Sequence, residues 1–100
     1  MRLLMKVWCL PEELKEEDLQ ALFWKLLETI KSVPEVGVRS EKDITILFPA
    51  DRMKWGLGEN IVVEISDIPP LLGYIKRGFS EKIIETLQHR FPSAYIDCKV

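Results

Sequence analysis

The side chains most often used in nucleophilic and metal chemistry are few in this chain. Its single histidine, His89, lies near the expected end of a helix and has no Cys or His neighbour at metal-ligand spacing. The two cysteines, Cys9 and Cys98, lie in apolar, strand-like runs, where we expect buried thiols that form no disulfide. No serine or cysteine has an evident histidine partner in the sequence. The pattern therefore predicts no metal site and indicates no nucleophile paired with histidine.

Two further motifs are also expected to be structural. The glycine motif Gly56–Gly58 is followed by neither a lysine nor a helix start, so it predicts a turn rather than a phosphate loop. Lys76, Arg77 and Lys82 form a small basic cluster that we expect to be solvated. The net charge is -2 and the pI about 5.4, so no field favours binding to nucleic acid or an anionic membrane.

Length and composition indicate one soluble domain, residues 1–100. Hydrophobic residues make up 47% and charged residues 30%, a balance typical of a globular chain with a small core. The first ten residues are too short for a signal peptide, and no apolar run has the length of a membrane span. We therefore expect a cytoplasmic protein.

Four strands are predicted from alternation and from β-branched or aromatic runs. In the first strand, Leu3, Met5 and Val7 face one way, and Leu4 and Trp8 face the other. In the last strand, Tyr95, Asp97 and Lys99 share one face. The predicted strands cover Leu3–Leu10, Ile44–Phe48, Ile61–Ile68 and Ala94–Val100.

Two helices are predicted between these strands. The first covers Glu12–Ser32, and its apolar residues recur at helical spacing as one stripe. The second lies within Leu72–Phe91, although Gly73 and Gly78 weaken its first half. The stripe of the first helix consists of Leu19, Leu22, Phe23, Leu26, Leu27 and Ile30.

The element order, β-α-β followed by a turn-rich link at Ala50–Asn60 and a second β-α-β, fits two folds. In a ferredoxin-like fold the middle strands pair as a hairpin. In a tautomerase-like fold each β-α-β unit is parallel within itself, and the two units lie side by side. In both folds the helices cover one face of the sheet, so residues such as Leu4 and Trp8 need a partner subunit to cover them.

The middle of the chain carries a family resemblance in the runs Ile44–Met53, Trp55–Gly58 and Ile61–Ile65, together with the closing Tyr95–Asp97. This pattern resembles the tautomerase superfamily, and in particular its macrophage migration inhibitory factor-like members. The resemblance implies an α/β (α+β) two-layer sandwich with both helices on one face of a four-stranded sheet. It also implies a homotrimer that needs no cofactor and binds a small carboxylate between its subunits.

The resemblance also implies roles for individual residues. The amine of Met1 would move a proton between carbon and oxygen of an enol or keto acid, while Lys31 holds the substrate carboxylate. Tyr95, supplied by a neighbouring subunit, would polarise the substrate. The positions implied to line the pocket are Arg2, Ile68 and Asp97.

The chain departs from the family pattern in three places. Met1 and Arg2 stand where the family has an N-terminal proline, and we expect the bulky Arg2 to preserve Met1. Asp97 replaces an asparagine, and the chain ends at Val100 without the extra strands of longer members. Three functions stay open: a keto-enol tautomerase, a non-catalytic tautomerase-like oligomer favoured by Arg2, and a ferredoxin-like ligand-binding module.

Overall fold

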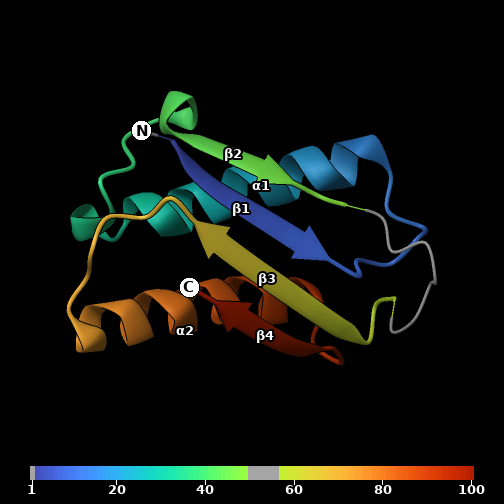
Figure 1. Cartoon of the computed structure of the whole chain (residues 1–100). Helices are drawn as coiled ribbons and strands as arrows, with labels where there is room; N and C mark the ends of the chain where they lie inside the picture. Colours follow the sequence, from blue (N-terminus) through green and yellow to red (C-terminus); the bar gives the residue numbers. More distant parts are fainter. Residues whose placement is uncertain (1, 50–56) are drawn as a thin grey trace.

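The chain forms a four-stranded sheet with two helices on one of its faces (Figure 1). The computed structural model describes residues 2–49 and 57–100. Within these two ranges, no helix is long and apolar enough to cross a membrane. The elements are β1 (Leu3–Trp8), α1 (Glu16–Lys31), the 3-10 turns η1 (Pro34–Val36) and η2 (Glu41–Asp43), β2 (Ile44–Leu47), β3 (Asn60–Ser66), α2 (Gly73–Arg90) and β4 (Tyr95–Lys99).

The strand order, β2-β1-β3-β4, distinguishes the two predicted folds. β1 and β2 are parallel, β3 and β4 are parallel, and β1 is antiparallel to β3. Each helix therefore connects two parallel strands, as parallel pairing requires a long crossover. The predicted tautomerase-like arrangement is confirmed. The ferredoxin-like alternative is wrong, because β2 is an edge strand that pairs with β1 and not with β3.

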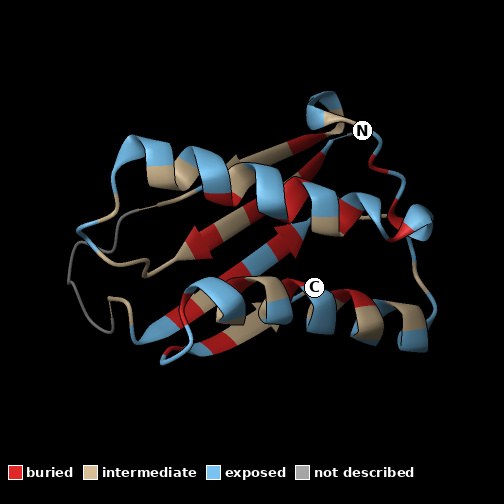
Figure 2. Cartoon of the chain, turned by 180° about the vertical axis from the view of Figure 1, so that it is seen from behind, coloured by how far each residue is buried: buried red, intermediate tan, exposed pale blue. Residues whose placement is uncertain are grey.

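The core lies between the sheet and the helices, as the burial colours show (Figure 2). Leu3, Met5 and Val7 of β1 are buried, which confirms the predicted alternation. The buried helix residues are Leu22, Leu26, Leu27 and Ile30 of α1 and Phe79, Ile83 and Leu87 of α2. We call the opposite side of the sheet the helix-free face. By alternation and register it carries Leu4, Lys6, Trp8, Thr45, Leu47, Val62, Glu64, Ser66, Tyr95, Asp97 and Lys99.

The first helix starts one turn later than predicted, at Glu16 instead of Glu12. The Gly58 N–H donates to the Cys9 carbonyl at 2.7 Å, and Gly58 lies directly against Pro11. A Cβ at Gly58 would lie 3.2 Å from Pro11 Cγ, and its φ of 75° also favours glycine. This contact holds the chain in a turn after β1, so the helix begins beyond it.

β1 and β3 end two residues earlier than predicted, because the backbone leaves the extended conformation, while β2 and β4 end one residue earlier. Cys9 has a φ of 68° and Asp67 a φ of 60°, so β1 ends at Trp8 and β3 ends at Ser66. Cys9 therefore follows its strand instead of lying within it. Cys9 and Cys98 are half-buried rather than fully buried, and no disulfide joins them.

Part of the predicted link lies outside the described residues. This part holds Trp55 and Gly56, and with them the section of the family-like pattern between residues 50 and 56. The rest of the glycine motif, from Leu57 to Gly58, is in a turn, as predicted.

Candidate functional site

The beginning of β1 is the place where the family resemblance puts chemistry. Met1 lies outside the described residues. The next residue, Arg2, is exposed, and its Nη2 donates to the Ile44 carbonyl at 3.2 Å. This bond ties the beginning of β1 to the beginning of β2, its parallel neighbour.

The η2 turn fixes the beginning of β2. The Asp43 carboxylate accepts a hydrogen bond from the Arg39 N–H at 2.9 Å and another from the Ser40 N–H at 3.2 Å. These backbone donors, with Arg39 contributing most, lower the pKa of Asp43 below its ordinary value. The ionised carboxylate therefore holds the backbone that leads into Ile44, the residue contacted by Arg2.

Lys31 and Ile68 lie toward the same end of the sheet as Arg2. α1 runs back from the far end of β1, so its last residue, the exposed Lys31, lies toward the beginning of β1 (Figure 1). β3 pairs antiparallel with β1, with Ser66 opposite Leu4, and the half-buried Ile68 follows just beyond. Three of the six predicted residues are therefore at one end of the molecule.

Two shallow hollows lie near this end, and Val100 lines both of them. One, of about 280 Å³, is lined by Ile68, Pro69, Pro70, Leu71, Lys76 and Val100. The other, of about 220 Å³, is lined by Lys6, Glu64, Ile65, Ser66, Lys99 and Val100. Three of the lining side chains are lysines, and these offer ammonium donors to an acidic ligand.

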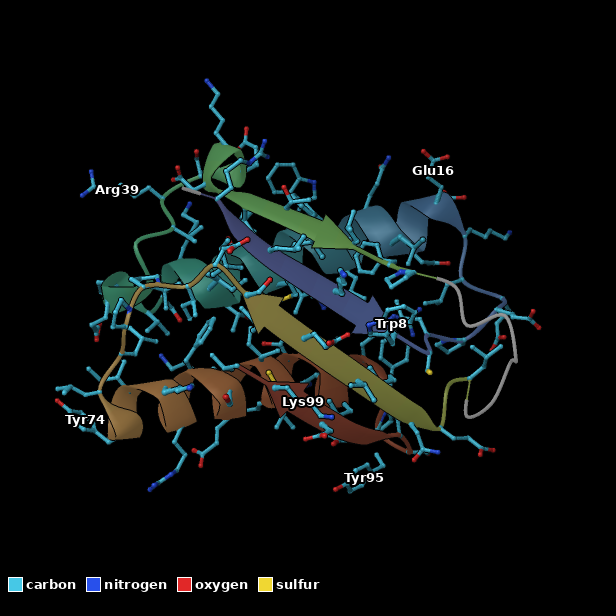
Figure 3. The ribbon with its side chains drawn as sticks, in the orientation of Figure 1. Trp8, Glu16, Arg39, Tyr74, Tyr95 and Lys99 are labelled. Carbon is cyan, nitrogen blue, oxygen red and sulfur yellow. The ribbon has the colours of Figure 1, made fainter. Side chains whose placement is uncertain are left out.

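Tyr95 and Asp97 lie at the other end of the sheet. Tyr95 pairs with Asn60, the first residue of β3, whereas Leu4 pairs with Ser66, the last. β3 is seven residues long, so at about 3.3 Å per residue these two ends are roughly 20 Å apart. Tyr95 is 71% exposed and projects from this end (Figure 3). One chain therefore does not bring Tyr95 to its own Arg2.

A row of charges across the helix-free face was not predicted from the sequence. Lys6 pairs with Glu64, and Glu64 pairs with Lys99, so the three side chains stand side by side on neighbouring strands. The Trp8 indole N–H donates to the Glu64 carboxylate at 2.6 Å. Alternation assigns these residues to one face, but no local signal gives the register that aligns them.

The described residues contain no group of three or more His, Cys, Asp or Glu side chains that could hold a metal ion. The predicted site residues in this part of the chain carry cationic and hydroxyl groups, which can form hydrogen bonds to a carboxylate. The structure supplies these groups at two separated ends of the sheet, not in one enclosed cavity.

Solved structures of known proteins share this fold. A wild-type fused 4-OT (4-oxalocrotonate tautomerase), described as an asymmetric trimer, matches with a TM-score of 0.71 and 15% identity over 96% of this chain and 82% of that one. A 5-carboxymethyl-2-hydroxymuconate isomerase from Deinococcus radiodurans R1 matches with a TM-score of 0.53 and 16% identity, over 99% and 82%. No protein-family model and no curated protein matches the sequence significantly. The predicted resemblance to the tautomerase superfamily is thus confirmed for the fold.

Proposed function

We propose that this chain is a tautomerase-superfamily protein that assembles as a homotrimer and binds a small carboxylic or keto acid between its subunits. The separation of the predicted site residues is the observation that carries this proposal. Arg2, Lys31 and Ile68 lie at one end of the sheet, and Tyr95 lies roughly 20 Å away. Residues so far apart in one chain can share a ligand only if two copies contribute to the same pocket.

The helix-free face supports assembly. It exposes Leu47 and Tyr95 and leaves Leu4 and Trp8 half-buried, so apolar side chains of three strands meet water on this face. The matched fused 4-OT structure is itself a trimer. Packing the helix-free faces of three copies together would cover this surface and bring unlike ends of the sheets into contact.

In the proposed pocket, Lys31 and Arg2 of one copy bind the ligand carboxylate through charge-assisted hydrogen bonds. Ile68 provides an apolar wall, and Tyr95 of another copy donates its hydroxyl to the ligand carbonyl. Asp97 of that copy lies beside this tyrosine.

The Met1 amine takes a proton from one end of the enol system and returns a proton to the other. We expect no cofactor, because in this scheme the protein's own amine, cations and hydroxyl move the proton and bind the ligand.

The test is the conversion of an arylpyruvate enol to its keto form, followed by ultraviolet absorbance. We expect Tyr95→Phe and Lys31→Ala to lower kcat/KM by about tenfold or more, since each removes a polar contact to the ligand. The matched controls are Tyr74→Phe, which alters a tyrosine that is 70% exposed, and Lys25→Ala on the same helix as Lys31. Selective acetylation of the Met1 amine should abolish turnover. A rate equal to that of buffer, unchanged by acetylation, would show that the protein is not a tautomerase.

A second candidate is a non-catalytic oligomer that binds the same acids. Arg2 favours it, because Met1 and Arg2 stand in the sequence where the family has its proline base. The Arg2 guanidinium also donates to the Ile44 carbonyl. In that case arylpyruvate would bind at Lys31 and Tyr95 without turnover. Saturable binding that both substitutions weaken, together with an uncatalysed rate, would identify this function. The cytoplasmic location is a prediction for both candidates.

A further inference from the structure

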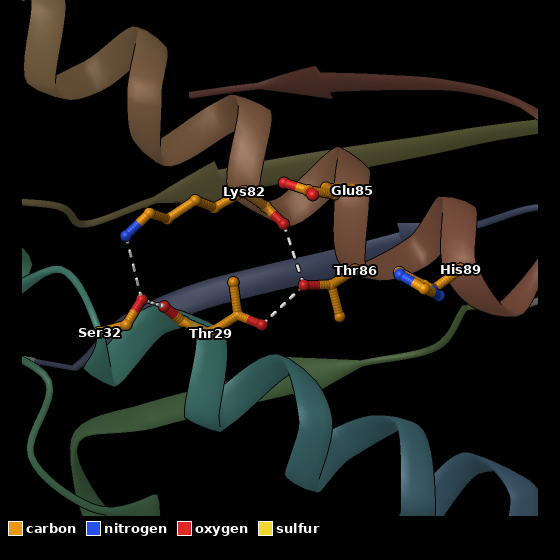
Figure 4. Close-up of a pocket in the computed structure, with 6 residues that line it drawn as sticks. All are labelled: Thr29, Ser32, Lys82, Glu85, Thr86 and His89. Carbon is orange, nitrogen blue, oxygen red and sulfur yellow. Dashed lines mark hydrogen bonds between the residues drawn. The ribbon is translucent and has the colours of Figure 1, made fainter.

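A polar groove lies between the two helices, on the opposite side of the sheet from the helix-free face (Figure 4). Its volume is about 270 Å³, slightly below the range of about 300 to 1,000 Å³ typical of drug-sized ligands. The α2 residues in it are spaced i, i+3, i+4 and i+7, so they form one stripe along that helix. The lining residues are Thr29 and Ser32 from α1 and its C-cap, and Lys82, Glu85, Thr86 and His89 from α2.

Both threonine hydroxyls in this groove donate their protons to hydrogen bonds within the protein. Thr29 Oγ1 lies 3.0 Å from the Lys25 carbonyl, Thr86 Oγ1 lies 2.9 Å from the Lys82 carbonyl, and the two Oγ1 atoms are 2.7 Å apart. Each hydroxyl has one proton. At 2.7 Å one of the two hydroxyls must donate its proton to the other. The hydroxyl that accepts this bond then donates its own proton to the carbonyl of its own helix. Whichever direction holds, both protons are used within the protein, so the two hydroxyls can only accept hydrogen bonds from a ligand.

The hydroxyl proton of Ser32 is also used within the protein. Its hydroxyl donates to the Thr29 carbonyl at 2.5 Å, and it accepts from the Lys82 ammonium at 3.4 Å. The three hydroxyls therefore act as acceptors, and a ligand that meets them must bring N–H or O–H donors.

The groove holds one lysine and one glutamate, which form no ion pair with each other. Lys82 is a cation with three N–H donors, of which one contacts Ser32, so two are left for a ligand. No hydrogen bond or ion pair joins Glu85 to another residue in the described part of the chain. One lysine and one glutamate thus line the same small groove, with the hydroxyl acceptors and the His89 imidazole beside them (Figure 4).

We propose that this groove binds a small zwitterion of the amino-acid type. The ligand ammonium donates to the Glu85 carboxylate and to the hydroxyl pair of Thr29 and Thr86. The ligand carboxylate accepts from the two remaining N–H groups of Lys82. A zwitterion satisfies both charges of the groove, whereas a simple anion leaves Glu85 and the hydroxyl lone pairs unmatched, and a simple cation leaves Lys82 unmatched. The proposal stands independently of the function proposed above.

The test is an NMR titration of the ¹⁵N-labelled protein with glycine and β-alanine, and separately with sodium acetate and methylammonium chloride at constant ionic strength. We expect the zwitterions to shift the amide signals of Ser32, Glu85 and Thr86 in a saturable way. Glu85→Gln and Lys82→Met should each weaken the binding by about tenfold, the value of one charged hydrogen bond. The controls Glu81→Gln and Lys42→Met make the same charge changes at exposed positions outside the groove and should leave the affinity unchanged.

Each contrary outcome has a definite meaning. Shifts that stay linear in ligand concentration would overturn the proposal, as would equal affinity in Glu85→Gln and the unchanged chain. Acetate binding as tightly as glycine would show an anion site, and methylammonium binding as tightly would show a cation site. The same spectra show whether each variant is folded, so a failed titration cannot be confused with a failed fold.

Discussion

The two faces of the sheet differ in what they do for the molecule. On the face under the helices, Met5, Val7 and Val63 have no exposed surface, and their neighbours on both helices are equally apolar. On the helix-free face, Lys6, Glu64 and Lys99 form a charged row, and Tyr95 is largely exposed. The same four strands therefore carry a buried apolar core on one side and a solvent-facing mixture of charged and apolar side chains on the other.

The two faces are expected to contribute differently to the folding of one chain and to its proposed association. Burial of the inner face supplies the hydrophobic free energy that folds a single chain. The outer face adds less to that folding, because its side chains still meet water. In the proposed trimer, the apolar and charged side chains of this face would contact another copy. We therefore expect changes to the two faces to have different signatures.

The largest effect is expected from truncation of adjacent residues that point to opposite faces. Met5→Ala should lower the free energy of unfolding by about 2 to 5 kcal/mol, because it leaves a cavity in a fully buried site. Leu4→Ala, which alters a half-buried side chain, should cost about 1 kcal/mol within one chain. Urea denaturation at several protein concentrations measures both. Only the loss of unfolding free energy in Leu4→Ala should depend on the protein concentration. If both variants lose the same free energy at every protein concentration, the two faces do not differ in this way.

A smaller effect is expected from the inner-face thiol. Desolvation raises the pKa of Cys98 to about 11, with the nearby Asp97 carboxylate adding to the rise and a hydrogen bond with Ser80 opposing it. The unfolded thiol ionises near pH 8.5 to 9. Since the unfolded chain loses this proton first, Cys98 lowers stability as the pH rises from about 9 to 11, by up to about 2 kcal/mol.

The measurement for Cys98 is a comparison of unfolding free energies between pH 8 and pH 10.5 for the unchanged chain and Cys98→Ala. Lysines and tyrosines titrate in both proteins, so only the difference between their slopes reports on Cys98. A shallower alkaline decline in Cys98→Ala is expected. Identical slopes would mean that the thiol is well solvated in the folded chain.

The smallest effect is expected from the charged row on the helix-free face. Glu64→Gln keeps an acceptor for the Trp8 indole but removes its charge, and it leaves Lys6 and Lys99 without the carboxylate between them. We expect a loss of about 1 kcal/mol in the free energy of unfolding, the difference between a charged and a neutral hydrogen bond. The control is Glu35→Gln, an exposed glutamate in η1. If both changes have the same effect, the row does not stabilise the sheet.

Local patterns predicted the elements well. The alternation of Leu3, Met5 and Val7 and the apolar stripe of the first helix depend only on neighbours in the chain, and both appear in the structure. The beginning of α1 was missed because it depends on the contact between Pro11 and Gly58, which are far apart in sequence. The turn at Cys9 likewise involves a distant residue, because the Gly58 N–H donates to the Cys9 carbonyl.

The candidate site was harder to predict than the fold. The charged row and the hydrogen bond from Trp8 to Glu64 need the strand register, and the groove needs the packing of Thr29 on Thr86. Neither has a local signature in the sequence. The roles proposed for Lys31 and Tyr95 involve two copies of the chain, so they depend on an assembly that a single chain does not contain.

The most direct test of the central claim is the molar mass in solution, measured by light scattering on a size-exclusion column. One chain has a mass of 11.6 kDa. If subunits share pockets as proposed, the protein should elute with three times that mass, and Leu4→Ala should shift the mass toward that of one chain on dilution. A protein that stays monomeric or dimeric at every concentration would contradict the account, because Tyr95 could then not reach Lys31 in a trimeric pocket.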